Sequence, residues 1–258
     1  MAVRKSLTFS VSGKGGAGKT TLTALLLKTL LESNKHDILV IDADPVMNLP
    51  YSLGIDLDEK TTLGMILDEK KIELKTKNHF YGKLLEAKIW ESIIEQEYFD
   101  LLIMGSSKGE GCYCTLNNFT AIIIESLTKM YDYIIIDFHA GFEHLSRRTD
   151  RAADILLIIT DPSKMGFGTS RRIIEIIEEV NISFREILLV GNRFNVKWEK
   201  KLSDFSAEIG VKFAGIIPDD QNIVEFNLKG KSLISLPKNS PAFIAVKNLF
   251  EKIKTSKL

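Results

Sequence analysis

The feature that most constrains how this chain can fold is a glycine-rich loop at residues 13–20. It reads Gly-Lys-Gly-Gly-Ala-Gly-Lys-Thr, follows an apolar run at 7–12 and precedes a leucine-rich stretch at 19–33. This spacing is G-x-x-x-x-G-K-[ST], in which glycines let backbone amides curl around phosphate oxygens at the start of a helix. The alternative, a glycine-rich turn with an incidental lysine, fits the flanking segments poorly. The pattern therefore predicts a strand, a phosphate-binding loop and a helix, in that order.

The residue types in this loop predict a nucleotide ligand together with Mg²⁺. Lys19 would lie against the β- and γ-phosphates, and the Thr20 hydroxyl would bind Mg²⁺. The residues expected to contact the nucleotide are Gly13, Lys14, Gly15, Gly16, Ala17, Gly18, Lys19, Thr20 and Thr21.

Further apolar runs recur along the chain, with stretches of helical length between them. They lie at 37–41, 100–104, 133–136, 155–160, 186–190 and 212–217. Because these runs are continuous rather than alternating, they suit strands buried on both faces of a parallel sheet. We therefore expect an α/β fold, a mostly parallel doubly wound sheet flanked by helices, as a single domain over 1–258. The part at 56–96, rich in lysine and glutamate, is expected to be a helical insertion.

Composition and charge narrow the function classes. The 34 basic residues balance 34 acidic ones, which argues against a general electrostatic grip on nucleic acid or anionic lipid. Two cysteines are too few for a disulfide framework, and no apolar run reaches the roughly 18 residues of a membrane span. We expect a cytoplasmic protein with no nucleic-acid partner and no stable membrane anchor.

Carboxylates follow two of the predicted strands. Asp42 and Asp44 come directly after the run at 38–41, and Asp137 ends the run at 133–136. Ligands bind at the carboxyl ends of the strands in open α/β sheets. A carboxylate at the end of a buried strand can also hold Mg²⁺ through water. For Asp42 and Asp44, the alternative is that they only cap the turn between the strand and the following loop.

Lys14 makes the loop more specific. Lys-Gly-Gly-x-Gly-Lys resembles the deviant phosphate loop of the MinD, ParA and nitrogenase-iron-protein class of P-loop ATPases. The resemblance implies that Lys14 reaches across a homodimer interface to the partner's ATP, where a second cation stabilises charge on the transferred phosphoryl group. It also implies that Asp44 polarises the attacking water and that Asp42 supports the Mg²⁺ site or the loop. Lys14 and Lys19 with Asp44 are then the catalytic residues. A solvated Lys14 is the alternative.

The same resemblance assigns roles to later residues. Gly141 matches a glycine whose amide meets the γ-phosphate, although His139 departs from the small residues expected beside it. Asn192 would hydrogen-bond the adenine, and Pro218 lies in a segment that would flank the base. A histidine facing solvent is the simplest interpretation of His139.

Both cysteines fall in one short motif, Cys112-Tyr113-Cys114. One intervening residue strains a disulfide, whereas two thiolates near a helix start are soft metal ligands. Two thiolates cannot complete a four-coordinate site, but a two-fold dimer supplies two from each chain. The alternative is a pair of small buried residues.

The cysteine motif resembles that of CooC-type ATPases, which mature nickel carbon monoxide dehydrogenase. The similarity extends to Ala-Gly-Phe-Glu-His-Leu at 140–145 and Leu-Lys-Gly at 228–230. It implies a dimerising Mg²⁺-ATPase that holds Ni²⁺ between its subunits and delivers it to the carbon monoxide dehydrogenase apoprotein. Tetrathiolate sites also suit Zn²⁺.

Two other functions remain open. One is a partitioning or positioning ATPase of the ParA or MinD type, for which the apolar and lysine-rich tail at 241–258 could lie on a membrane surface. Docking of that tail onto the sheet is the more common outcome. The other is an iron–sulfur electron donor.

Overall fold

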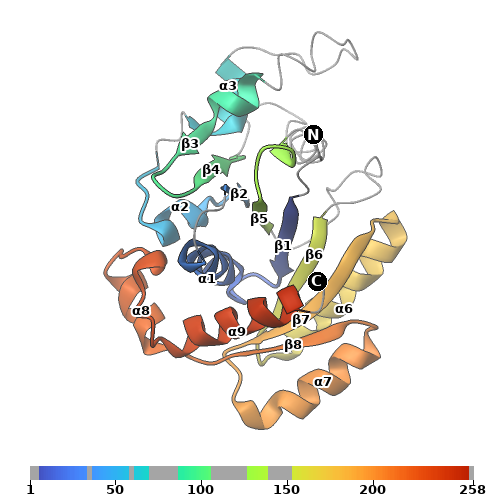
Figure 1. The fold of residues 1–258 in the computed structure, drawn as a ribbon. Helices are drawn as coiled ribbons and strands as arrows, with labels where there is room; N and C mark the ends of the chain where they lie inside the picture. The colour runs from blue at the N-terminus through green and yellow to red at the C-terminus, as the bar shows by residue number, and fades with distance from the viewer. Residues whose placement is uncertain are drawn as a thin grey trace.

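A single sheet organises the chain. The computed structural model describes residues 6–33, 37–57, 61–69, 87–105, 127–138 and 153–255. Eight strands form the sheet in the order β3-β4-β2-β5-β1-β6-β7-β8 (Figure 1). The strands are β1 (Leu7–Gly13), β2 (Ile38–Ala43), β3 (Ile93–Glu95), β4 (Asp100–Ile103), β5 (Tyr133–Phe138), β6 (Ala153–Thr160), β7 (Phe184–Asn192) and β8 (Lys212–Ile217).

All neighbouring strands pair in parallel except β3 and β4. The central strands are buried almost throughout, since they are covered from both sides. The predicted fold class, a mostly parallel doubly wound sheet flanked by helices, is confirmed. The carboxyl ends of β1, β2, β5, β6 and β7 meet at one edge of this sheet.

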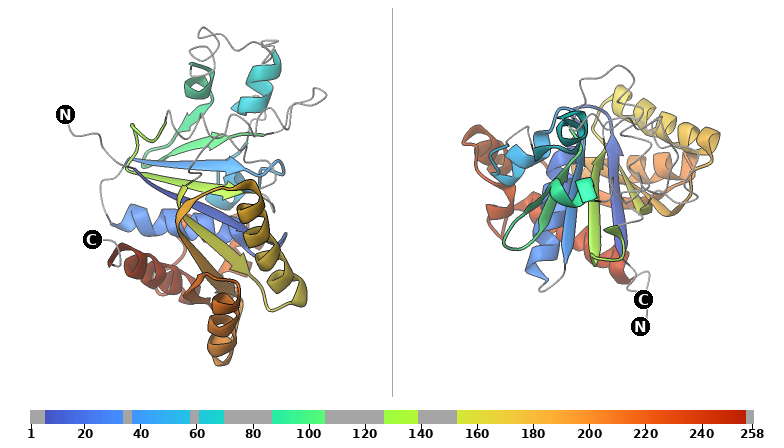
Figure 2. Two further views of the ribbon diagram at one scale, coloured as in Figure 1. Left: turned by 90° about the vertical axis from the view of Figure 1, so that its right-hand side faces the viewer. Right: turned by 90° about the horizontal axis from the view of Figure 1, so that it is seen from above.

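Helices cover both faces. They are α1 (Lys19–Glu32), α2 (Asn48–Leu53), α3 (Leu63–Glu69), α6 (Lys164–Val180), α7 (Glu199–Glu208), α8 (Gln221–Leu228) and α9 (Pro241–Thr255), with 3-10 turns η2 (Val196–Trp198) and η3 (Leu233–Ser235). On one face α1 and α9 pack against strand residues such as Phe9 and Val11. On the other, α6 and α7 pack against residues such as Leu156 and Ile158. Figure 2 shows these helices on the two sides of the sheet.

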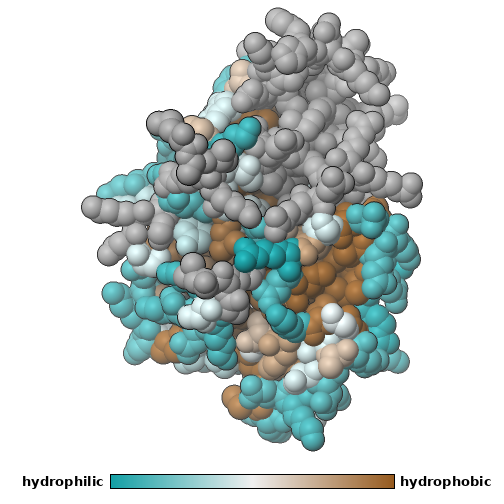
Figure 3. Space-filling view, turned by 45° about the vertical axis from the view of Figure 1, so that its right-hand side comes forward, coloured by the Kyte–Doolittle hydropathy of each residue, from teal (hydrophilic) through white to brown (hydrophobic). Residues whose placement is uncertain are grey.

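The long helix α6 shows how these layers form. It buries Ile173, Ile176 and Ile177 at helical spacing while Arg171 and Arg172 face solvent. Its Ser163 cap accepts a hydrogen bond from the Gly166 amide at 3.0 Å. Figure 3, which brings the right-hand side of Figure 1 forward, shows hydrophilic side chains bordering a hydrophobic area on this side.

Two expectations outside the sheet core can be compared with the structure. The tail forms α9, whose apolar side chains are buried against α1 and β1, as docking predicts: Phe243, Val246, Leu249, Phe250 and Ile253. The part at 56–96 is not simply a helical insertion, because β3 adds an antiparallel edge strand there beside the helix α3. Three residues are too few for a strand to be recognised from hydropathy.

No helix among the described residues is long and apolar enough to cross a membrane.

Candidate phosphate-binding site

The loop between β1 and α1 is shaped by glycine conformations. Gly16 and Gly18 have φ angles of 76° and 103°, in the region that side chains disfavour. A Cβ atom on Gly18 would lie 2.3 Å from Nδ2 of Asn192, so a side chain there would displace the Asn192 amide. The Ala17 amide donates to the Lys14 carbonyl at 3.0 Å, which closes the turn. The loop thus has the compact curl that the sequence pattern predicts.

The start of α1 is arranged to receive an anion. Gly18 precedes the helix without a side-chain cap, so the positive end of the helix dipole faces the loop. The adjacent cavity of about 430 Å³ is lined by Gly15, Gly16, Gly18, Lys19, Thr20, Thr21, Asp44, Val46 and Asn48. Lys19 is buried with 8% of its surface exposed. A second cavity, of about 460 Å³ beside Tyr98 and Tyr131, lies away from this edge and has no glycine loop.

Two carboxylates face each other at the ends of adjacent strands. Asp42 of β2 and Asp137 of β5 are paired in register, and both are fully buried. Burial, with the charge of Asp137, raises the pKa of Asp42 to about 8. Burial also raises the pKa of Asp137 to about 7, although Thr20 and Lys19 act to lower it. Two buried carboxylates this close favour a bound cation or a proton.

Asp137 is the better candidate for Mg²⁺, because its buried carboxylate lies beside Thr20 and Lys19 and no backbone amide is bonded to either of its oxygens. A buried carboxylate next to a hydroxyl suits a hard cation that prefers oxygen ligands. Asp42 differs, since its oxygens accept from the amides of Asp44 at 3.0 Å and Leu49 at 3.1 Å. Asp42 therefore holds the loop that follows β2, one of the two roles expected for it.

Asp44 lines the cavity opposite the glycine loop. Its Oδ1 accepts from the Val46 amide at 3.0 Å, which fixes the carboxylate in a tight turn before α2. The structure thus brings Asp44 to the phosphate loop, as the spacing of the motif predicts.

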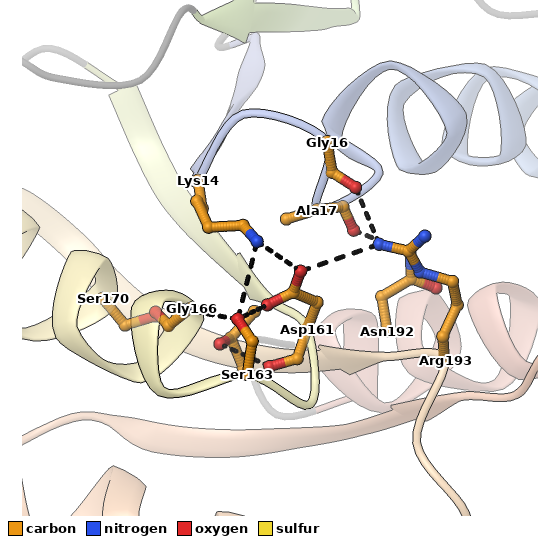
Figure 4. Close-up of polar contacts among 10 residues, drawn as sticks. Lys14, Gly16, Ala17, Asp161, Ser163, Gly166, Ser170, Asn192 and Arg193 are labelled. Atoms are coloured by element: carbon orange, nitrogen blue, oxygen red, sulfur yellow. Dashed lines mark hydrogen bonds and ion pairs between the residues drawn. The ribbon is translucent and has the colours of Figure 1, made fainter.

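Lys14 is bound within its own chain. Its Nζ lies 2.7 Å from Oδ2 of Asp161, and Ser163 Oγ donates to Oδ1 of the same carboxylate at 2.5 Å (Figure 4). Burial alone would raise the pKa of Asp161, but the contacts with Lys14 and Ser163 hold it below its usual range. Ser163 also caps α6, so the loop lysine is linked directly to the start of that helix.

The end of β7 also contacts the loop. Asn192 Nδ2 donates to the Ala17 carbonyl at 2.7 Å, and the Arg193 guanidinium donates to the Gly16 carbonyl at 2.7 Å (Figure 4). The Arg193 amide donates to the Ile217 carbonyl at 2.8 Å, which places Pro218 beside this segment. The two segments expected to flank a base are thus neighbours, and the Asn192 amide nitrogen is bonded to the loop.

Several expected residues lie outside the described part of the chain. These are Gly141, His139, Cys112 and Cys114. Among the described residues, no group of three or more His, Cys, Asp or Glu side chains is placed to hold a metal ion.

Sequence reasoning missed Asp161, Ser163 and Arg193. The available signal was positional: Asp161 directly follows β6, which lies next to β1 in the sheet. A polar residue at the carboxyl end of a strand beside β1 lies at the same edge as the glycine loop. Arg193 follows Asn192 in a left-handed conformation with φ of 60°, which the sequence does not reveal.

Comparison with known proteins is consistent with this geometry. The CobQ/CobB/MinD/ParA nucleotide-binding domain matches residues 9–234. An uncharacterised ATP-binding protein of Methanocaldococcus jannaschii is 41% identical over 251 residues, covering 96% of this chain and 98% of that protein. The carbon monoxide dehydrogenase accessory protein CooC of Rhodospirillum rubrum is 29% identical over 191 residues, covering 68% and 71%.

The fold also matches solved structures. The septum site-determining protein MinD of Pyrococcus horikoshii, solved in complex with Mg-ADP, superposes with a TM-score of 0.70. The match covers 98% of both chains at 23% sequence identity.

Proposed function

Since this chain belongs to the CobQ/CobB/MinD/ParA family of nucleotide-binding domains, we propose that it is a Mg²⁺-dependent ATPase that works as a homodimer. One observation carries the proposal: the buried carboxylate of Asp137 lies beside Lys19 and Thr20 at the glycine loop, with no backbone amide bonded to it. The 41% identical relative is named as an ATP-binding protein, which supports ATP as the nucleotide.

The residues of the site divide the work of binding and hydrolysis. The loop amides and the start of α1 bind the phosphates, and Lys19 neutralises their charge. Thr20 and Asp137 would hold Mg²⁺, which neutralises charge that develops on the phosphoryl oxygens. Asp44 orients the attacking water, because it lines the cavity and its position is fixed by the Val46 amide.

The proposed role of Lys14 requires that it first leave its partner within its own chain. In the single chain its charge is neutralised by Asp161 at 2.7 Å. To act on the partner's ATP, it must exchange Asp161 for a phosphate across the interface. The exchange replaces one anion with another, so it leaves no unpaired cation. Nucleotide-dependent dimerisation and hydrolysis are then coupled through one side chain.

We further propose that the dimer is a nickel metallochaperone that assists carbon monoxide dehydrogenase maturation. The support is the Cys112-Tyr113-Cys114 motif together with the 29% identity to CooC. Two thiolates from each subunit would form the four-donor site, which can hold Ni²⁺ or Zn²⁺. The metal is cargo, and ATP hydrolysis opens the dimer to release it.

Equilibrium dialysis against Ni²⁺ and Zn²⁺ tests this cargo site, with gel filtration in parallel. One metal per dimer is expected, with binding lost in Cys112→Ser and Cys114→Ser variants that still bind ATP. One metal per monomer, or tight binding by the double variant, contradicts the shared site. Metal binding should also weaken as the pH falls, because protons compete for the thiolates.

The second candidate is a positioning ATPase of the MinD type. Its support is the septum site-determining protein MinD of Thermotoga maritima, which is 29% identical over 94% of this chain, a larger share than the CooC alignment covers. Most apolar side chains of α9 are buried rather than available to a membrane, and Ile244 is the large one that is exposed. Co-sedimentation with anionic vesicles, with and without ATP, separates the two candidates. Sedimentation that depends on ATP favours the positioning ATPase, and the absence of sedimentation favours the metallochaperone.

A further inference from the structure

The turn before α7 exposes side chains that are usually buried. Val196 and Trp198 of η2 have 67% and 44% of their surfaces exposed. The chain has only two tryptophans. Residues 195–201 are all exposed, so the two apolar side chains lie within a continuous solvent-facing segment. Exposed tryptophan in a fixed turn is typical of interface anchors.

The segment carries more positive than negative charge, with three lysines against one glutamate. Lys197 and Lys201 place their Nζ atoms 5.7 and 5.4 Å from the Trp198 ring centroid. In the described part of the chain, no carboxylate pairs with these two lysines or with Lys200. By contrast, Lys212, Lys229 and Lys247 each have a carboxylate partner. Glu199 is the single acid within residues 195–201.

The segment is also held in place. The Asn195 side chain accepts from the Lys197 amide at 3.0 Å and caps η2. Leu202 and Phe205 anchor α7 in the core. The segment therefore presents its lysines and its tryptophan on a preformed surface, which lowers the entropy cost of binding.

The chain path connects this surface with the nucleotide loop. Asn192 and Arg193, which bond the carbonyls of Ala17 and Gly16, precede the turn by only a few residues. A partner bound here would therefore lie close along the chain to the two residues that hold the glycine loop.

We propose that residues 196–201 dock an acidic segment of a partner protein. Its carboxylates would meet Lys197, Lys200 and Lys201, while an apolar side chain would cover Trp198 and Val196. Charge complementarity argues for an acidic occupant. The chain has zero net charge, and this surface offers only three lysines beside two apolar side chains. Such a surface suits a protein better than a nucleic acid, whose binding rests on many phosphate contacts. This docking surface does not depend on the proposed ATPase activity.

Tryptophan fluorescence tests the docking surface directly. In a Trp90→Phe background, Trp198 is the only tryptophan, so its emission reports on this surface alone. The probe is a synthetic peptide of alternating glutamate and leucine, titrated without nucleotide. We expect a saturable change that weakens with added salt. The Lys197→Glu, Lys201→Glu double variant should bind roughly tenfold more weakly or worse.

Controls keep the result interpretable. The matched variant is Lys252→Glu, Lys254→Glu, which makes the same charge change at the far end of α9; it should bind like the parent. Circular dichroism checks that each variant is folded. The proposal is overturned if the folded parent gives no signal, or if a lysine–leucine peptide binds equally well. It is also overturned if single-stranded DNA or anionic vesicles bind more tightly, or if the surface instead mediates self-association that Trp198→Ser abolishes.

Discussion

Lys14 of the glycine loop and Asp161 at the end of β6 form an ion pair of 2.7 Å, so the single chain already neutralises the lysine proposed to act on a partner's ATP. The pair is mostly shielded from solvent, with 23% and 11% of the two side chains exposed. In the proposed mechanism, the strength of this pair contributes to the equilibrium between monomer and dimer.

Asp161→Asn should make dimerisation easier. The variant removes the negative charge that holds Lys14. A partly buried ion pair contributes about 1 kcal/mol, so its loss should raise the dimerisation constant roughly fivefold. Analytical ultracentrifugation with a non-hydrolysable ATP analogue measures the dimerisation constant.

Lys14→Ala is the companion variant, and it should retain most nucleotide binding yet lose hydrolysis. Wild-type hydrolysis by Lys14→Ala contradicts the role across the interface.

Asp44→Ala should separate binding from hydrolysis. The variant keeps the glycine loop, Lys19 and Asp137, so it should bind Mg-ATP with near-normal affinity. Hydrolysis should fall by about 10²-fold or more, because the water loses its orienting group. Gel filtration with ATP should then show a trapped dimer. Lys19→Ala is the contrasting variant, expected to lose both binding and activity. An Asp44→Ala protein that stays monomeric with bound ATP would remove the argument that Asp44 acts after closure.

The nucleotide-free protein should become less stable as the pH rises. Burial raises the pKa of Asp137 from 3.8 to about 7. Between these values the folded chain keeps a proton that the unfolded chain has released, so the free energy of unfolding falls with rising pH. The contribution is complete below pH 4 and is lost as the pH passes about 7. Thermal melts across this range should show the slope, and Asp137→Asn should reduce it.

The affinity for Mg²⁺ should change with pH in the opposite direction to the stability of the nucleotide-free protein. The cation needs the ionised carboxylate, so its affinity should increase as the pH rises through about 7, the pKa of Asp137. Isothermal titration at several pH values measures both the affinity and the proton release. An affinity for Mg²⁺ that does not change with pH would show that Asp137 does not lose a proton when the cation binds.

Arg193→Ala should weaken nucleotide binding. The guanidinium holds the Gly16 carbonyl at 2.7 Å and lies 3.8 Å from Asp161, so it fixes the loop from the side of β7. Loss of one charge-assisted hydrogen bond to an exposed side chain should reduce affinity about two- to tenfold. A fluorescent ATP analogue provides the measurement. Arg172→Ala on α6 is the control, because its contacts are to Glu175 and Glu179 on the surface.

The sequence predicted the parts of the site that lie close together along the chain. Gly18, Lys19 and Thr20 form one local motif, and Asp137 ends a run of isoleucines, so local patterns place them. The partners of Lys14 were not predictable in this way. Asp161 comes to the loop only because β6 lies beside β1, and strand order depends on packing across the whole sheet. Arg193 depends in addition on a backbone conformation that its residue type does not favour.

The two outer strands of the sheet limit how copies of this chain can assemble. At one edge β3 has only three residues, and at the other the register of β8 against β7 shifts between Leu189 and Val190. A short strand and an irregular one are poor templates for a further strand. Lys212 at the start of β8 pairs with Glu186 at 2.9 Å, which also places charged groups at that margin. The sheet therefore resists continuation into a second molecule, which guards against fibrillar aggregation and leaves side-chain surfaces as the means of association.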